Sequence, residues 1–161
     1  MAKEHICSVT VTWTGNRGSG TSAYGAYSRD HVIEAIDKRP IEGSSDPAFR
    51  GDSSRYSPED LLVAAISACH MLWYLHLCAD AGIIVVAYAD SAVGVLEMAP
   101  DGSGRIGGVT LRPEVMVQAG ADLDRARRLH ETATHKCFVA NSVAFPIAFE
   151  PTIQVEAIVS L

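Results

Sequence analysis

The sequence lacks the short motifs that mark the common metal and hydrolase sites. It has no CxxC and no HExxH, the spacings at which cysteine or histidine pairs bind zinc. It also has no GxSxG, the strand-to-helix turn that presents a nucleophilic serine. The adjacent Cys69 and His70 point about 100° apart on a helix, so a zinc site there needs ligands from elsewhere in the chain. These absences argue against a zinc enzyme or a serine hydrolase, and we expect no metal, flavin or haem cofactor.

Positive charge is also scarce. The chain has 13 Lys and Arg against 19 Asp and Glu, a net charge of −6, and no basic run. Nucleic acids and anionic lipids bind clustered Lys and Arg, so we expect neither as a partner. The polar residues 1–5 lead directly into a strand-like pattern, so we expect no secretory leader and a reducing, cytoplasmic compartment, where the four cysteines are free, catalytic or metal-bound. With 48% apolar and 20% charged residues, the 161-residue chain has the composition of one globular domain spanning residues 1–161.

The most unusual segment, from Leu61 to Ala79, contains no charged residue and is long enough to cross a bilayer. Its flanks are acidic, however, and it carries Ser67 and two histidines, which are costly in lipid. Ser57 suits the N-cap of a helix, Pro58 its first position and Asp60 a capping box, and Gly82 suits its end. The pattern predicts a core helix of about 24 residues rather than a membrane span. A helix apolar on every side must be covered on every side, which favours a dimer with this helix near its centre.

The segments around this helix predict strands and one further helix. Alternation predicts a strand over residues 6–13, one or two more over 24–36, others over 83–99 and 104–119, and a closing strand over 152–161. Pro113 indicates an edge strand or a bulge. Residues 39–60 are predicted to form a long loop that is either functional or packed across a partner chain. Residues 121–137 predict a second helix that buries Leu123, Ala126, Leu129 and Ala133. The fold class is therefore α+β, one domain with two groups of antiparallel strands.

The four cysteines differ in setting. Cys7, on the apolar face of a predicted strand, and Cys78 are expected to be packed in the core, where free cysteine behaves as a small hydrophobe. Cys137, at the C-terminus of the second helix, gains no acidity from the helix dipole and suits a resolving thiol. Cys69 needs a neighbouring cation to react as a thiolate. An arginine stays charged in a partly buried site, and the loop candidates are Arg17, Arg50 and Arg55.

Two stretches resemble the OsmC/Ohr family of thiol peroxidases, which reduce organic hydroperoxides. "SPEDLLVAAISACHMLWYLHLCADAGI" is similar to the family's Asn/Ser-Pro-Glu-Glu-Leu helix start and its Ala-Cys-His/Phe segment, and "CFVANS" is similar to its Cys-Pro-x-Ser-Asn segment. The first stretch resembles the OsmC-like branch more than the Ohr branch. The sequence departs from the pattern at Phe138 and Ala140, where the family often has Pro and Ser.

The resemblance implies a role for each matching residue. Cys69 is implied to be the peroxidatic thiolate and Cys137 the resolving thiol, which closes a disulfide with it after oxidation. Glu59 matches the glutamate that positions and releases an arginine, and that arginine is either Arg17 or Arg50. The implied architecture is an intertwined homodimer with antiparallel sheets from both chains around long central helices. A dithiol or thioredoxin-like protein would be the reductant.

Spacing on the helix adds one hypothesis to this scheme. Glu59 and Cys69 are ten positions apart, about 15 Å along one helix, so a site containing both draws Glu59 from the partner chain. His70, beside the thiol, either tunes it or fills space. Leu72, Trp73, Phe138 and Phe145 favour an alkyl or lipid hydroperoxide, although core packing explains them equally. The alternative function is non-enzymatic, in which an OsmC-fold dimer binds a hydrophobic small molecule at its interface.

Overall fold

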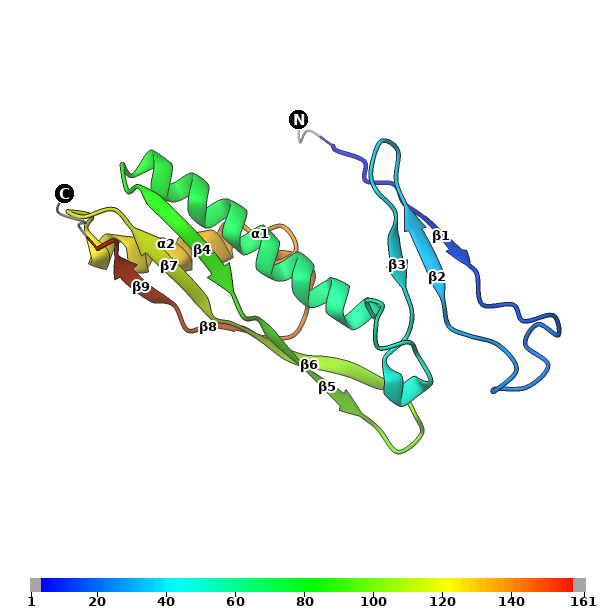
Figure 1. The fold of residues 1–161 in the computed structure, drawn as a ribbon. Coiled ribbons are helices and arrows are strands. Elements are labelled where there is room, and N and C mark those ends of the chain that lie inside the picture. Colours follow the sequence, from blue (N-terminus) through cyan, green and yellow to red (C-terminus); the bar gives the residue numbers. More distant parts are fainter. Residues whose placement is uncertain (1–3, 158–161) are drawn as a thin grey trace. The chain divides into compact units, whose positions relative to one another are not determined.

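The computed structural model describes residues 4–157. It forms two compact units, the described residues up to Leu61 and those from Leu62 onward, and each is described by itself. The elements, labelled in Figure 1, are β1 (Thr10–Trp13), β2 (His31–Glu34), β3 (Ile41–Gly43), η1 (Pro47–Phe49), α1 (Pro58–Asp80), β4 (Val85–Asp90), β5 (Val93–Met98), β6 (Gly104–Leu111), β7 (Pro113–Val117), α2 (Leu123–Lys136), η2 (Ala140–Ser142), β8 (Ile147–Phe149) and β9 (Thr152–Val155). The expected α+β class is confirmed, and the expectation of a single domain stays a prediction.

The first unit is an antiparallel meander of three short strands in the order β1-β2-β3. The predicted first strand over residues 6–13 is confirmed only from Thr10 onward. Cys7 precedes β1 and is exposed, so the prediction that it packs in the core is wrong. Alternation alone placed Cys7 on an apolar face, but in the single chain β1 is itself exposed along its whole length.

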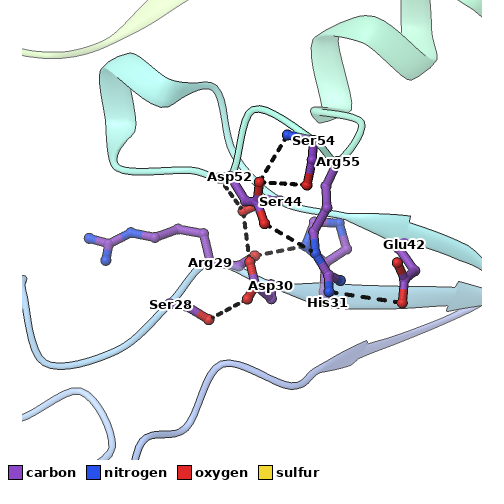
Figure 2. Close-up of polar contacts among 9 residues, drawn as sticks. All are labelled: Ser28, Arg29, Asp30, His31, Glu42, Ser44, Asp52, Ser54 and Arg55. Carbon is purple, nitrogen blue, oxygen red and sulfur yellow. Dashed lines mark hydrogen bonds and ion pairs between the residues drawn. The ribbon is translucent and has the colours of Figure 1, made fainter.

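Polar contacts order the loop over residues 39–60, and Figure 2 shows them. The buried Ser44 hydroxyl donates to Oδ1 of Asp30 over 3.1 Å and accepts the backbone N–H of Asp52 over 3.1 Å. Ser28 donates to the other carboxylate oxygen of Asp30 over 2.8 Å. Both the N–H and the hydroxyl of Ser54 donate to Asp52, and these bonds hold the pKa of the Asp52 carboxyl below its usual value. The loop is therefore tied to the start of β2 by its own side chains.

Helix α1 begins at the predicted place. The backbone N–H of Asp60 donates to the Ser57 hydroxyl over 3.1 Å, and the N–H of Ser57 donates to the Asp60 carboxylate over 3.0 Å. This reciprocal pair is a capping box, which satisfies two N–H groups that a helix start leaves without partners. After Asp80 the chain turns at Gly82, whose φ of 71° lies in the left-handed region that favours glycine.

The second unit contains two three-stranded sheets in the orders β4-β7-β9 and β5-β6-β8. The β4–β7 and β5–β6 pairs are antiparallel, whereas β7–β9 and β6–β8 are parallel. The expectation of purely antiparallel sheets is therefore wrong here, because α2 carries the chain back along the unit before β8 and β9 begin. Pro113 is not at an edge either, since it begins the central strand β7, a position where a missing N–H is tolerated.

Both helices pack on the sheet β4-β7-β9. Alternate residues of β7 are buried, and Val115 and Val117 form one core cluster with Tyr74 and Cys78 of α1 and with small residues of α2. The prediction that Cys78 packs in the core is confirmed, because its side chain is fully buried. A second cluster joins Ile66 of α1 to β6. The closing strand is confirmed as β9, while residues 158–161 of the predicted segment lie outside the described residues.

Helix α1 is buried on one side only in the single chain. Its buried side chains, Ile66, His70, Tyr74 and Cys78, recur every fourth residue and so form one face. The opposite face is an exposed apolar stripe of Ala64, Ala65, Ala68 and Leu72, and 63% of the Leu72 side chain is accessible. By length and composition, α1 is the one helix among residues 4–157 that could cross a membrane, which is weak support for a span when one face packs in a core.

Candidate active site

The second unit brings together the two cysteines that the family pattern pairs. Cys69 lies in the middle of α1, and Cys137 is the residue at which α2 ends, with its N–H bonded to the carbonyls of Ala133 and Thr134. The Cys137 thiol is fully buried and hydrogen-bonds Cys69, which is partly exposed. Sixty-eight positions of sequence thus separate two sulfur atoms that are neighbours in the fold.

The environment of Cys137 keeps its sulfur protonated. Burial and, next, the hydrogen bond to Cys69 raise the pKa of the Cys137 thiol to about 11. The backbone N–H of Ala140, in the turn η2, donates to Sγ over 3.3 Å and opposes this rise only in part. The turn over "FVANS" supplies this donor although Phe138 and Ala140 differ from the family's residues. Chemically, Cys137 is a thiol at neutral pH and a hydrogen-bond donor toward Cys69.

Apolar side chains flank the thiol pair on the accessible side. Trp73, one turn after Cys69 on α1, meets the ring of Phe138 edge to face at a centroid distance of 6.1 Å. Phe138 directly follows Cys137 and is 73% exposed. An exposed aromatic ring beside a cysteine offers apolar surface that a small molecule can contact.

Behind the thiol pair, two histidines meet in the core. His70 follows Cys69 on α1 and is 1% exposed, and His130 of α2 is fully buried. Nε2 of His70 lies 2.9 Å from Nδ1 of His130, and the two ring planes are nearly parallel, with an interplanar angle of 6° and centroids 5.2 Å apart. Thr134 Oγ1 lies 3.4 Å from Nδ1 of His70 and donates to the carbonyl of His130 over 3.0 Å.

Burial keeps both histidines neutral. It lowers the pKa of His70, an effect that the nearby Asp90 carboxylate opposes. Burial, and then the proximity of His70, lower the pKa of His130 to about 3. Nε2 of His130 and the hydroxyl of Tyr88 have no hydrogen-bond partner among the described residues, whereas the Tyr74 hydroxyl lies against the Cys78 thiol. His130 also stacks on Tyr74 at a centroid distance of 3.8 Å.

One more polar contact ties α1 to the sheet. The Ser67 hydroxyl, two residues before Cys69, donates to the Asp90 carboxylate over 2.5 Å. The other oxygen of Asp90 accepts the N–H of Arg112 over 2.6 Å. Asp90 ends β4, so this carboxylate fixes the thiol-bearing turn of α1 against the end of that strand.

The remaining predicted site residues lie in the first unit. Glu59 is half-buried in the first turn of α1, and Arg17 is exposed in the loop after β1. Arg50 has a left-handed φ of 63° and lies over the ring of Tyr24 at 5.3 Å. Arg55 instead faces two carboxylates, those of Glu42 and Asp52, at 3.9 and 3.6 Å. The choice between Arg17 and Arg50 stays open.

A fourth arginine in this unit, Arg29, was not predicted from the sequence. Arg29 lies between the rings of Tyr24 and Tyr27, each 4.3 Å from its guanidinium carbon, and donates to both of their carbonyls. These contacts hold its planar group in one orientation. The spacing Tyr24-x-x-Tyr27-x-Arg29 is the signal that could have indicated it. His130 and Thr134 were not predicted either, because no local pattern in the sequence marks them.

The structure offers no cluster for a metal in its described part. Among residues 4–157, no three His, Cys, Asp or Glu side chains are grouped so that they could hold an ion. The chemistry available at the site is therefore that of two thiols, an apolar rim and a buried imidazole pair.

Comparison with known proteins identifies the family. The model of the OsmC-like protein family matches residues 51–152. The structure of an OsmC-like protein of unknown function from Vibrio cholerae O1 biovar eltor strain N16961 is 31% identical, has a TM-score of 0.82, and is matched over 94% of this chain and 100% of that one. A comparison with curated protein sequences gives no match.

More distant structures share the fold alone. An organic hydroperoxide resistance protein from Elizabethkingia anophelis is 18% identical with a TM-score of 0.67, over 96% of this chain and 100% of that one. The organic hydroperoxide resistance protein OhrB of Bacillus subtilis is 19% identical with a TM-score of 0.62, over 93% and 98% of the two chains. The matched region contains both Cys69 and Cys137. The chain belongs to the OsmC-like protein family.

Proposed function

We propose that the chain is a cysteine-based thiol peroxidase that reduces organic hydroperoxides to alcohols. The observation that carries this proposal is the hydrogen bond between the Cys137 thiol and Cys69 in the second unit. Two neighbouring cysteines, one accessible and one buried, are what a two-cysteine redox cycle requires. Structures with the same fold that are named organic hydroperoxide resistance proteins support the reaction class.

The first step oxidises Cys69. Its thiolate sulfur attacks one peroxide oxygen, the O–O bond breaks, and the alkoxide takes a proton and leaves as the alcohol. Sulfur has then lost two electrons and carries a hydroxyl, as a sulfenic acid. Cys69 suits this role because it is the member of the pair that solvent can reach.

The second step closes a disulfide. The sulfur of Cys137 attacks the sulfenic sulfur of Cys69, an S–S bond forms, and the S–O bond breaks. The departing hydroxide takes the Cys137 proton, and water leaves. A small dithiol or a thioredoxin-like protein then reduces the disulfide and returns both thiols.

An arginine supplies the positive charge in this scheme. Arg17 or Arg50 holds the Cys69 thiolate, and Glu59 positions that arginine. Glu59 and Cys69 both lie on α1, ten positions apart, so we propose that Glu59 acts in the site of the partner chain. The exposed apolar stripe of α1 supports the homodimer that this sharing needs.

The apolar rim supports an alkyl or lipid hydroperoxide as the substrate. Phe138 and Trp73 offer aromatic surface next to the thiols. An alkyl group can bury apolar area against this surface, whereas hydrogen peroxide has no apolar group to do so. We expect cumene hydroperoxide to be reduced faster than hydrogen peroxide at equal concentration.

The test is a thiol count before and after equimolar cumene hydroperoxide is added to the fully reduced protein. We expect the loss of two thiols per chain and a proteolytic fragment in which a disulfide links Cys69 to Cys137. The Cys69→Ser variant should consume no peroxide. The Cys78→Ser variant is the matched control, since its thiol is buried elsewhere in the core and should leave the reaction unchanged.

The contrary result is equally clear. If all four thiols persist while the peroxide survives, the peroxidase proposal fails. The chain is then better explained as an OsmC-fold dimer that binds a hydrophobic small molecule at its interface.

A further inference from the structure

The two helices that carry the thiols are joined by a hydrogen-bonded clamp of the buried His70 and His130 and the half-buried Thr134. His70 is adjacent to Cys69 on α1, while His130 and Thr134 lie seven and three residues before Cys137 on α2. The contact between Nε2 of His70 and Nδ1 of His130 is 2.9 Å and lies in the core. The clamp therefore lies within one helical turn of Cys69 and two of Cys137.

The contacts assign the direction of each hydrogen bond. Thr134 has one hydroxyl proton, and its shorter contact, 3.0 Å, is to the carbonyl of His130, which can only accept. The Nδ1–H of His70 then donates to Thr134 Oγ1, and Nε2 of His70 accepts the Nδ1–H of His130. This leaves Nε2 of His130 as a buried acceptor that no described group satisfies.

Such a cluster is costly in a core. A buried polar atom without a partner destabilises a fold, and apolar side chains of similar volume would pack there without that cost. What the cluster offers in return for this cost is a defined geometry. Hydrogen bonds fix the separation and rotation of two helices more narrowly than apolar contacts do. The two ring planes are tilted by only 6°, as a hydrogen bond in the plane of both rings requires.

Disulfide closure needs such a constraint. A disulfide forms only within a narrow range of Cα separations and dihedral angles, so a small shift between α1 and α2 moves Cys137 out of line with the oxidised sulfur of Cys69. The alternative fate of the sulfenic acid is further oxidation to the sulfinic acid. The relative rates of closure and overoxidation therefore depend on how well the two helices are held.

We propose that His70, His130 and Thr134 are positioning residues for the resolving step, holding Cys137 in line with Cys69 through the hydrogen bonds between α1 and α2. The inference rests on the proposed peroxidase function. It adds that the clamp serves the second step and not the first, because the attack of Cys69 on the peroxide does not require the Cys137 sulfur to be in line with it.

The test compares His130→Leu, which removes both ring nitrogens, with His130→Asn, which keeps an N–H donor near the place of Nδ1. Single-turnover reactions with cumene hydroperoxide give the rate of peroxide loss and, after alkylation of free thiols and mass analysis, the rate of disulfide formation. We expect peroxide loss to be unchanged in both variants. Disulfide closure should slow about tenfold in His130→Leu, with more sulfinic acid at Cys69, and should recover in His130→Asn.

A second assay separates this inference from the peroxidase function. Diamide oxidises thiols without a peroxide, so it drives closure of the same Cys69–Cys137 bond by a different leaving group. If the wild-type protein ignores cumene hydroperoxide but His130→Leu still slows closure by diamide, the peroxidase proposal fails and the clamp stands. If His130→Leu closes at the wild-type rate, or His130→Asn is as slow as His130→Leu, the clamp is overturned.

A milder variant covers the case in which His130→Leu does not fold, as judged by circular dichroism. Thr134→Val removes the hydroxyl while keeping the shape of the side chain, and Thr132→Val, at an exposed position on α2, is its matched control. Slower closure in Thr134→Val alone supports the clamp. Closure at the wild-type rate in Thr134→Val overturns it.

Discussion

The buried Cys137 thiol donates a hydrogen bond to the partly exposed Cys69, so the two neighbouring sulfur atoms differ in their access to solvent. A pKa of about 11 leaves about one part in ten thousand of Cys137 as thiolate at neutral pH. Both burial and protonation therefore lower the reactivity of Cys137 toward external reagents. The asymmetry gives the pair an order of reaction.

Alkylation should reveal this order. We expect iodoacetamide at neutral pH to modify the exposed Cys7 and the partly exposed Cys69 before it reaches Cys78 or Cys137. Burial raises the pKa of Cys78 as well, so both buried thiols should react at least about a hundredfold more slowly. Peptide mass analysis over time measures each rate. Modification of Cys137 as fast as that of Cys7 would contradict the arrangement.

The capping box of α1 should contribute measurably to stability. Ser57→Ala removes the hydroxyl that accepts the N–H of Asp60, and we expect it to lower the free energy of unfolding by about 1 kcal/mol. Asp60→Ala should cost a similar amount, and the double variant should cost less than the sum because both changes break one reciprocal pair. Urea denaturation measures each value. Ser53→Ala, an exposed serine of the preceding loop, is the control and should change nothing.

Local signals explain what the sequence predicted well. The start of α1 depends on residues within four positions of one another, from Ser57 to Asp60, and was found at its exact place. The end at Gly82 depends on the conformation of one residue. The pairing of Cys69 with Cys137 came from a resemblance to a family, since no spacing rule connects positions so distant.

The features that were missed are those that depend on how separate elements meet. His130 lies sixty positions from the histidine that it contacts, and on α2 alone it looks like one of many polar residues. The parallel pairing of β8 and β9 depends on the path of the chain after α2, which no strand pattern encodes. The alternating pattern led to the wrong prediction for Cys7 because such a pattern shows which residues share one face of a strand. It does not show whether another element covers that face.

The exposed stripe of α1 predicts the effect of a charge on assembly. If a second chain covers Leu72, as the proposed homodimer requires, Leu72→Asp buries a charge without a partner and should convert the dimer to a monomer. Light scattering during gel filtration measures the mass. Thr132→Asp, at an exposed polar position on α2, is the control and should stay dimeric. A Leu72→Asp monomer that reduces cumene hydroperoxide at the full rate would contradict a site in which Glu59 comes from the partner chain.

The neutral histidine pair predicts a loss of stability in weak acid. In the folded protein burial lowers the pKa of His130 from its ordinary value of 6.5 to about 3, so between these values the unfolded chain binds more protons than the folded one. The free energy of unfolding must then decrease as the pH is lowered, by up to about 1.4 kcal/mol per pH unit for each such group. Above the unfolded value the contribution is complete, and below about 3 no more is lost.

Urea denaturation at about pH 7.5 and about pH 5 measures this contribution. The wild-type protein should be less stable at the lower pH by about 2 kcal/mol from His130 alone. His130→Leu should lose that part of the difference while keeping the rest. Asp52 and Asp101 do not interfere, because hydrogen bonds from Ser54 and Ser103 lower their pKa values from 3.8, so their contributions are lost only below this window. If the stability of His130→Leu changes with pH as much as that of the wild-type protein, His130 must be protonated in the folded protein in weak acid. That result would contradict the buried, neutral ring that the structure shows.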